Sequence, residues 1–200
     1  MKLYYSPGAC SLAPHLLLEQ LGLDYEAVPV RLDTHTYAGG DYYQVNPKGS
    51  VPALDLDEGG LLTENAVILQ YLADRRPEAG LLPPAGTLDR YRALEWVNFI
   101  ATELHKNFGP LFNPRTPEDY KTIARENIAK KLGFVADHLA IHPFLTGPTF
   151  GVPDAYLFVI LTWANRMRME AAGRPELIAF FDRVKALPAT RRALAAEGLA

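Results

Sequence analysis

The first part of the chain alternates short apolar runs with amphipathic segments. The apolar run at 2–5 predicts a strand that ends at a Ser-Pro-Gly turn. The leucine-rich stretch after it predicts a helix that stops near Gly22. Residues 25–32 return to an apolar, β-branched pattern, which predicts a second strand.

The next segments predict a hairpin followed by a helix. The apolar runs at 51–56 and 60–63 flank an Asp-Glu-Gly turn, the usual signature of two paired strands. Residues 64–75 carry apolar side chains at helical spacing and end before a proline. The order β-α-β and then β-β-α indicates a small α/β domain.

Residues 78–88 are rich in proline and glycine and are the candidate linker. They separate a first domain at 1–77 from a second at 89–200, where strand signals nearly vanish. Residues 155–164 are apolar on all sides and predict a central buried helix. Helical periodicity in the flanking segments predicts an all-α second domain; the positions that show it are Leu94, Val97, Ala101, Leu104 and Phe108, and then Ile128, Leu132, Val135 and Leu139.

Composition narrows the function classes. The chain has 200 residues, 48% of them hydrophobic and 22% charged, with a net charge of −3. This balance does not favour binding to a polyanion such as nucleic acid. The start of the chain lacks the apolar core of a signal peptide, and 155–164 is too short to cross a bilayer. We therefore expect a soluble protein of a reducing, cytoplasmic compartment.

Cys10 is the one cysteine of the chain, so it cannot form an internal disulfide. It stands where the first strand gives way to the first helix, and the N–H groups of a helix start favour thiolate over thiol. A buried, space-filling cysteine fits the same position. Ala13 occupies the place of the second cysteine of a dithiol oxidoreductase, so a disulfide with Cys10 requires an external thiol.

Two other strand and helix starts carry candidate binding groups. Val51 precedes Pro52 at the beginning of a strand, where a cis bond would leave the Val51 backbone free to pair with an extended ligand. Thr63, Glu64 and Asn65 precede an apolar helix. Local sequence favours a helix cap, with Thr63 or Asn65 as the capping residue, and the alternative is a polar clamp for a ligand carboxylate.

In the second domain, Asn98, Thr102 and His105 recur at steps of four and three, so they share one helix face beside Lys106. Such a polar stripe is normally the solvated side of a helix, unless another domain packs there. His138 and His142 are also four residues apart. Without a third ligand at suitable spacing we interpret them as surface residues and expect no metal site.

Three segments together resemble the glutathione transferase superfamily, and more closely its bacterial beta class. The segments are KLYYSPGACSLAPH, NPKGSVPALDLDEGGLLTENAVILQYLAD and LEWVNFIATELHKNFGPLFNP. The resemblance covers nearly the whole chain. It implies a thioredoxin-like α/β N-terminal domain with a cis-proline, followed by an all-α C-terminal helical domain.

The resemblance also implies roles in binding glutathione as co-substrate. Val51 would pair with the cysteinyl part of glutathione, and Glu64 and Asn65 would hold its γ-glutamyl end. His35 is the candidate for the basic residue that the family often places near the glycine carboxylate. Cys10 would lie at the glutathione sulfur, where beta-class proteins can form a mixed disulfide.

From the second domain, the resemblance implies that His105, with Lys106 and Asn98 nearby, projects towards that sulfur. Trp163 corresponds to the tryptophan of the buried helix near the substrate. The capping box before this helix departs from the family pattern, because Gly151 replaces Ser or Thr. Asp154 can still reach back to the Gly151 N–H, so we expect some loss of stability and little catalytic effect.

The sequence therefore predicts a glutathione transferase that joins reduced glutathione to hydrophobic electrophiles, with Cys10 and His105 as catalytic residues and thiol-disulfide exchange through Cys10. A homodimer is implied by the resemblance. Two alternatives stay open: a glutathione-dependent monothiol oxidoreductase, and a glutathione-binding protein without turnover.

Overall fold

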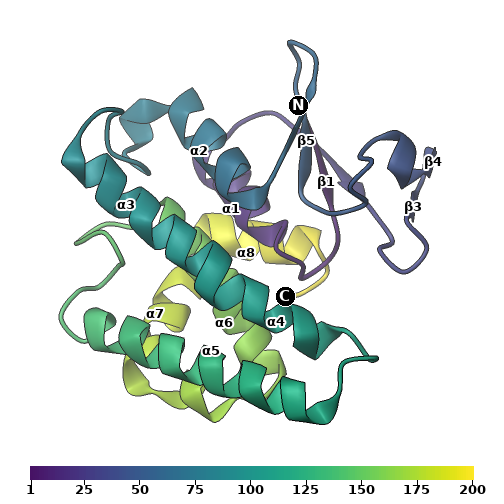
Figure 1. Cartoon of the computed structure of the whole chain (residues 1–200). Helices are drawn as coiled ribbons and strands as arrows, with labels where there is room; N and C mark the ends of the chain where they lie inside the picture. The colour runs from purple at the N-terminus through teal and green to yellow at the C-terminus, as the bar shows by residue number, and fades with distance from the viewer. The chain divides into compact units, whose positions relative to one another are not determined.

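A computed structural model describes all 200 residues, which divide into two compact units. Residues 1–80 and 186–200 form the first unit, and residues 81–185 form the second. This division differs from the predicted second domain at 89–200, because the last fifteen residues pack with the N-terminal unit. Figure 1 shows the chain coloured along its length.

The first unit is built on a four-stranded sheet in the order β2-β1-β5-β6. Its strands are β1 (Lys2–Tyr5), β2 (Glu26–Pro29), β5 (Ala53–Asp55) and β6 (Leu61–Thr63). β1 pairs with β2 in parallel and with β5 antiparallel, and β5 and β6 form the predicted hairpin. This mixed sheet confirms the thioredoxin-like architecture. A separate two-stranded sheet joins β3 (Thr36–Tyr37) and β4 (Gly40–Asp41).

Three helices complete the first unit: α1 (Leu12–Leu21), α2 (Asn65–Arg75) and α8 (Pro188–Ala196). α1 packs against both α2 and α8, and almost every side chain of α1 is buried (Figure 1). Gly22 ends α1 in the left-handed region, at φ 58°, as the sequence predicted. Two short 3₁₀ turns lie at Tyr42–Gln44 and Pro77–Ala79.

The second unit is all-helical, which confirms the predicted class. Its helices are α3 (Leu88–Phe99), the π-helical turn η3 (Ile100–His105), α4 (Lys106–Phe112), α5 (Glu118–Leu139), α6 (Val152–Arg166), the 3₁₀ turn η4 (Glu170–Gly173) and α7 (Pro175–Lys185). α3, η3 and α4 follow one another as a single long helix (Figure 1). α6 is the buried helix that the apolar run predicted, and α3, η3 and α7 pack around it.

The start of α6 is held by one buried carboxylate. Asp154 accepts the N–H of Gly151 and the N–H of Leu145, both at 2.8 Å. The predicted reach of Asp154 to Gly151 is therefore confirmed, and the same carboxylate also holds the segment that precedes the helix. None of the helices is both long and apolar enough to cross a membrane.

Candidate functional site

Cys10 lies in the loop between β1 and α1, and this loop is fixed by side chains on both of its sides. The hydroxyl of buried Ser11 accepts the Ser6 N–H at 3.1 Å and lies 3.3 Å from the Ser6 carbonyl, to which it donates. The Gly8 N–H donates to a carboxylate oxygen of Glu197 at 2.8 Å. These contacts give Cys10 a defined position at the start of α1.

The Cys10 thiol is a hydrogen-bond donor in this structure. It donates to the Val51 carbonyl oxygen at 3.1 Å. Burial raises the pKa of the Cys10 thiol to about 12, against the opposing effect of the Cys10 and Ser11 N–H groups. The negative charge of Glu64 raises this pKa further. The N–H groups at the helix start therefore lower this pKa, as expected, but the loss of solvation outweighs them, and the net effect in the free protein favours the thiol.

The Val51–Pro52 bond is cis, as the resemblance implied. The Val51 side chain is buried and its N–H makes no hydrogen bond within the protein. The preceding loop is shaped by two side chains that the sequence analysis did not single out: Tyr42 Oη and Asn46 Nδ2 both donate to the Ser50 carbonyl, at 2.9 and 2.8 Å. An asparagine before Pro-Lys-Gly is a turn signal that could have indicated Asn46.

Glu64 and Asn65 lie at the start of α2 in an unusual local conformation. Glu64 has a φ of 74°, a region that non-glycine residues rarely occupy and that is more frequent at functional sites. No side chain caps the helix, so the capping interpretation of Thr63 and Asn65 is wrong. Asn65 is 8% exposed, and neither its amide nitrogen nor its amide oxygen has a hydrogen-bond partner. Such a buried amide is costly unless a ligand satisfies it.

Lys48 is a neighbour of Glu64 that the sequence analysis missed. Its Nζ lies 2.5 Å from Glu64 Oε1 and 2.9 Å from Thr63 Oγ1. Both ends of this ion pair are exposed, so a charged ligand group could reach either of them. His35, the candidate for the glycine carboxylate, stacks on Tyr43 with ring centroids 4.6 Å apart.

His105, in the second unit, is the last residue of the π-helical turn. π-helical turns inside α-helices are frequent at functional sites. The His105 Nδ1 lies 2.6 Å from the Tyr156 hydroxyl, and the Trp163 ring lies 4.9 Å away in an edge-to-face arrangement. Burial, and secondarily the charge of Lys106, lowers the pKa of His105 to about 4. His105 is therefore a neutral imidazole at pH 7.

The other residues of the predicted polar stripe are more exposed than His105. Asn98 and Lys106 lie at the surface, and the Asn98 carbonyl accepts the Thr102 hydroxyl at 3.0 Å. The structure thus places Cys10 with the glutathione candidates of the first unit, and His105, Asn98 and Lys106 in the second.

An aromatic cluster accompanies His105. The Trp163 ring packs edge-on against Phe108 and Phe112, at centroid distances of 5.4 and 5.2 Å. Phe108 is fully buried, whereas Phe112 is 52% exposed. Apolar aromatic surface next to a neutral histidine suits a flat hydrophobic molecule.

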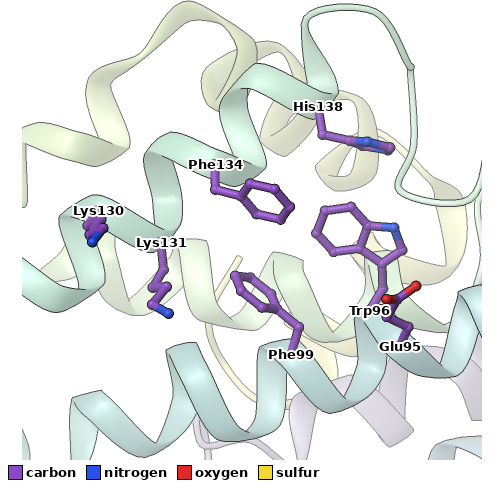
Figure 2. Close-up of a pocket in the computed structure, with 7 residues that line it drawn as sticks. All are labelled: Glu95, Trp96, Phe99, Lys130, Lys131, Phe134 and His138. Atoms are coloured by element: carbon purple, nitrogen blue, oxygen red, sulfur yellow. The ribbon is translucent and has the colours of Figure 1, made fainter.

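A second apolar feature of this unit is a groove of about 580 Å³ along α3 and α5. Figure 2 shows Trp96 and Phe99 from α3 facing Phe134 and His138 from α5, with Lys130 and Lys131 at one end. Trp96 lies 5.6 Å from Phe134 and 4.7 Å from His138. His138 is held by the Leu145 carbonyl at 3.0 Å and stacks against His142, so both histidines are half-buried.

Comparison with protein families matches both parts of the chain. The family model "Glutathione S-transferase, N-terminal domain" matches residues 1–74, and "Glutathione S-transferase, C-terminal domain" matches residues 99–188.

Individual proteins agree with these matches over full length. The chain is 48% identical over 200 residues to Glutathione S-transferase GstA of Escherichia coli O157:H7, covering 100% of both. The structure of a ternary complex of BphK, a bacterial GST, is 47% identical with a TM-score of 0.97, again over 100% of both chains. A sphingomonad glutathione S-transferase complexed with glutathione and a bacterial beta class enzyme of Sphingomonas chungbukensis each give a TM-score of 0.96, at 46% and 43% identity and 100% coverage of both chains.

Proposed function

The chain belongs to the glutathione S-transferase family, in its bacterial beta class, and is a glutathione transferase; we propose that Cys10, Val51, Glu64 and Asn65 hold glutathione while His105 acts on its sulfur. The single observation that carries the assignment of binding residues is Asn65, a buried amide without a partner beside Glu64. A γ-glutamyl group would satisfy Asn65, because its carboxylate can accept from the amide nitrogen, and its ammonium can join the exposed Lys48 as a partner of the Glu64 carboxylate.

The backbone of Val51 supports the same placement. Its N–H is available, and its carbonyl is occupied only by the Cys10 thiol. An extended peptide that pairs with Val51 would compete with the thiol for this oxygen. Binding of the cysteinyl part of glutathione would then release Cys10 from Val51 and bring the two sulfur atoms to the same N–H groups at the start of α1.

The reaction needs a glutathione thiolate and an electrophile held together. The thiol of glutathione loses its proton to solvent, and the sulfur lone pair forms a new C–S bond to the electrophilic carbon while the bond from that carbon to its leaving group breaks. In 1-chloro-2,4-dinitrobenzene the leaving group departs as chloride. The N–H groups of Cys10 and Ser11, which act on the Cys10 thiol in the free protein, and the His105 imidazole stabilise the developing thiolate. The exposed face of Phe112, next to Trp163, would take a hydrophobic aromatic electrophile.

The high pKa of Cys10 bears on the exchange reaction that the sequence suggested. Only a thiolate attacks a disulfide, so exchange by the free protein would be slow at neutral pH. We therefore assign conjugation as the main reaction and thiol-disulfide exchange through Cys10 as a slower one. A monothiol oxidoreductase would show the reverse order.

Steady-state assays and binding measurements separate these functions. We expect the protein to conjugate glutathione with 1-chloro-2,4-dinitrobenzene, and we expect Cys10→Ala to keep part of that activity. Complete loss in Cys10→Ala, together with loss of disulfide reduction, would favour the oxidoreductase. Glutathione binding by calorimetry without turnover on either substrate would favour a non-catalytic binding protein.

Variants at the start of α2 test the binding residues. Glu64→Gln and Asn65→Ala should each weaken glutathione binding about tenfold or more, because each removes a charge-assisted hydrogen bond. The matched control is Glu78→Gln, an exposed glutamate in the 3₁₀ turn Pro77–Ala79. Unchanged affinity in both Glu64 and Asn65 variants would remove these residues from the site.

A homodimer is the assembly we propose, with the groove of Figure 2 covered by a second copy. Phe134 is 56% exposed there, and the lysines at one end of the groove complement a chain whose net charge is −3. Phe134→Glu should convert the dimer to a monomer in light scattering coupled to gel filtration. A wild-type monomer, or an unchanged dimer in the variant, would contradict this placement.

We infer a cytoplasmic location, since the co-substrate is glutathione in its reduced form.

A further inference from the structure

A short polar contact joins His105 Nδ1 to the hydroxyl of Tyr156 in the buried helix α6. Tyr156 is 2% exposed and lies in α6, a helix that the sequence marks only as apolar core. Tyr156 and Trp163 are seven residues apart, two helical turns, so they share one face of α6. Both contact the His105 ring, at centroid distances of 5.8 and 4.9 Å. Two side chains of one buried helix therefore hold the imidazole.

The chemistry of the two groups indicates which of them donates the hydrogen. The Tyr156 oxygen and His105 Nδ1 are 2.6 Å apart, a hydrogen-bond distance at which the imidazole nitrogen donates or accepts according to its tautomer. A neutral imidazole nitrogen also accepts a hydrogen bond readily, and the phenol is the more acidic neutral donor of the two. His105 is neutral at pH 7, so its ring carries one hydrogen. If Nδ1 accepts a hydrogen bond from the Tyr156 hydroxyl, that hydrogen is on Nε2.

The charged groups around the ring oppose its protonation. Lys106 follows directly in the chain, and its positive charge disfavours an imidazolium. The nearest acidic residue of the same segment, Glu103, is paired with Lys131 at 2.6 Å. A histidine that serves as a base is usually oriented by a carboxylate, which stabilises the imidazolium that forms. A phenol supplies no such charge.

We propose that Tyr156 is a positioning residue for catalysis: its hydroxyl donates to His105 Nδ1 and fixes the Nε2–H tautomer, so that His105 donates a hydrogen bond to the glutathione sulfur and does not take the proton. This rests on the proposed function in one respect, that His105 faces that sulfur. The thiol proton then leaves to solvent, and the neutral imidazole stabilises the thiolate that remains.

The tautomer can be measured without glutathione. Nitrogen-15 spectra of the full-length protein labelled at histidine distinguish Nδ1–H, Nε2–H and imidazolium, and His105→Gln identifies the His105 signals. At pH 7 we expect the Nε2–H form in the wild type. An Nδ1–H or imidazolium form would overturn the proposal, and this measurement does not depend on whether a Tyr156 variant folds.

The role in catalysis is tested with Tyr156→Phe, with the exposed Tyr120→Phe as the matched control. The absorbance of the bound thiolate against pH gives the pKa of the glutathione thiol on the enzyme. In Tyr156→Phe we expect this pKa to rise by about one unit and kcat at pH 7 to fall about tenfold, with KM for glutathione within about twofold. A role limited to packing would change thermal stability and leave the thiol pKa unchanged, which would overturn the proposal.

The two hypotheses fail in different ways. If the Nε2–H tautomer is present but His105→Gln leaves the thiol pKa unchanged, His105 does not face the sulfur and the proposed site is wrong. If His105→Gln raises the thiol pKa while Tyr156→Phe alters neither the tautomer nor that pKa, the site stands and the positioning role of Tyr156 is wrong.

Discussion

His15 Nδ1 lies 2.8 Å from Glu197 Oε1, and neither side chain exposes any surface. His15 belongs to α1, whereas Glu197 directly follows α8, 182 residues further along the chain. The second carboxylate oxygen of Glu197 accepts the Gly8 N–H in the loop that carries Cys10. One buried carboxylate therefore ties the C-terminal segment to the first helix and to the candidate site.

Replacement of Glu197 should destabilise the first unit strongly. Glu197→Ala removes the carboxylate that accepts the Gly8 N–H and leaves buried His15 Nδ1 without its partner, and the loss of one member of a buried pair costs about 3–5 kcal/mol. Urea denaturation followed by circular dichroism measures this change in the free energy of unfolding. Glu78→Ala, at an exposed position, is the control and should change it by less than about 0.5 kcal/mol.

Asp154 should be nearly as important for the second unit. Asp154→Ala removes the acceptor for two buried backbone N–H groups at the start of α6, and the loss of a helix cap alone costs about 0.5–2 kcal/mol. We expect a loss of about 2–4 kcal/mol, with kcat of the folded enzyme within about twofold. An equal loss of stability in Asp119→Ala, an exposed acid in the first turn of α5, would show that the effect is not due to the buried cap.

Stability should fall in mild acid because of His105. Its pKa is about 4 in the folded protein, against 6.5 for an unperturbed histidine, so the unfolded chain binds more protons between these values. The contribution of the neutral ring is complete above pH 6.5 and is lost as the pH falls towards 4. Over this range the wild type should lose about 2–3 kcal/mol relative to His105→Gln, which has no titrating ring. Parallel stability curves for the two proteins would contradict the low pKa.

Alkylation reports directly on Cys10, since no other thiol is present. With a pKa of about 12, the fraction of thiolate at pH 8 is small, and reaction with iodoacetamide should accelerate until pH 10 and beyond. The same protein unfolded in guanidinium should react about 1000-fold faster at pH 8, because its thiol has an ordinary pKa. A folded protein that reacts at the unfolded rate would show that Cys10 is solvated.

The β5–β6 hairpin, the helix after it and the buried α6 follow from local pattern. Alternating apolar runs around a turn specify a hairpin, and a segment that is apolar on every side must be buried. The sequence also identified Gly22 as the end of α1, because the left-handed region that it occupies favours glycine.

Local pattern misjudged α2 and α8. At α2, Thr63 stands just before the helix, where a capping residue would, yet its hydroxyl accepts a hydrogen bond from the Lys48 ammonium. The residue between Thr63 and the helix, Glu64, adopts a positive φ. At α8, the sequence assigned the end of the chain to the second domain and predicted no separate helix there, because local pattern does not specify which surface an apolar face will cover. The partner of α8 is α1, at the opposite end of the chain.

By itself, the sequence determined the β5–β6 hairpin, the helices α1, α2 and α6, the two-part architecture and the identity of the thiol, since each depends on residue type and near neighbours. Only the tertiary structure decided the protonation states and hydrogen-bond partners of Cys10 and His105. Burial and the Val51 carbonyl make Cys10 a neutral donor, and a π-helical turn brings His105 to the Tyr156 hydroxyl. A pKa or a tautomer depends on solvation and on partners distant in sequence, which no local pattern contains.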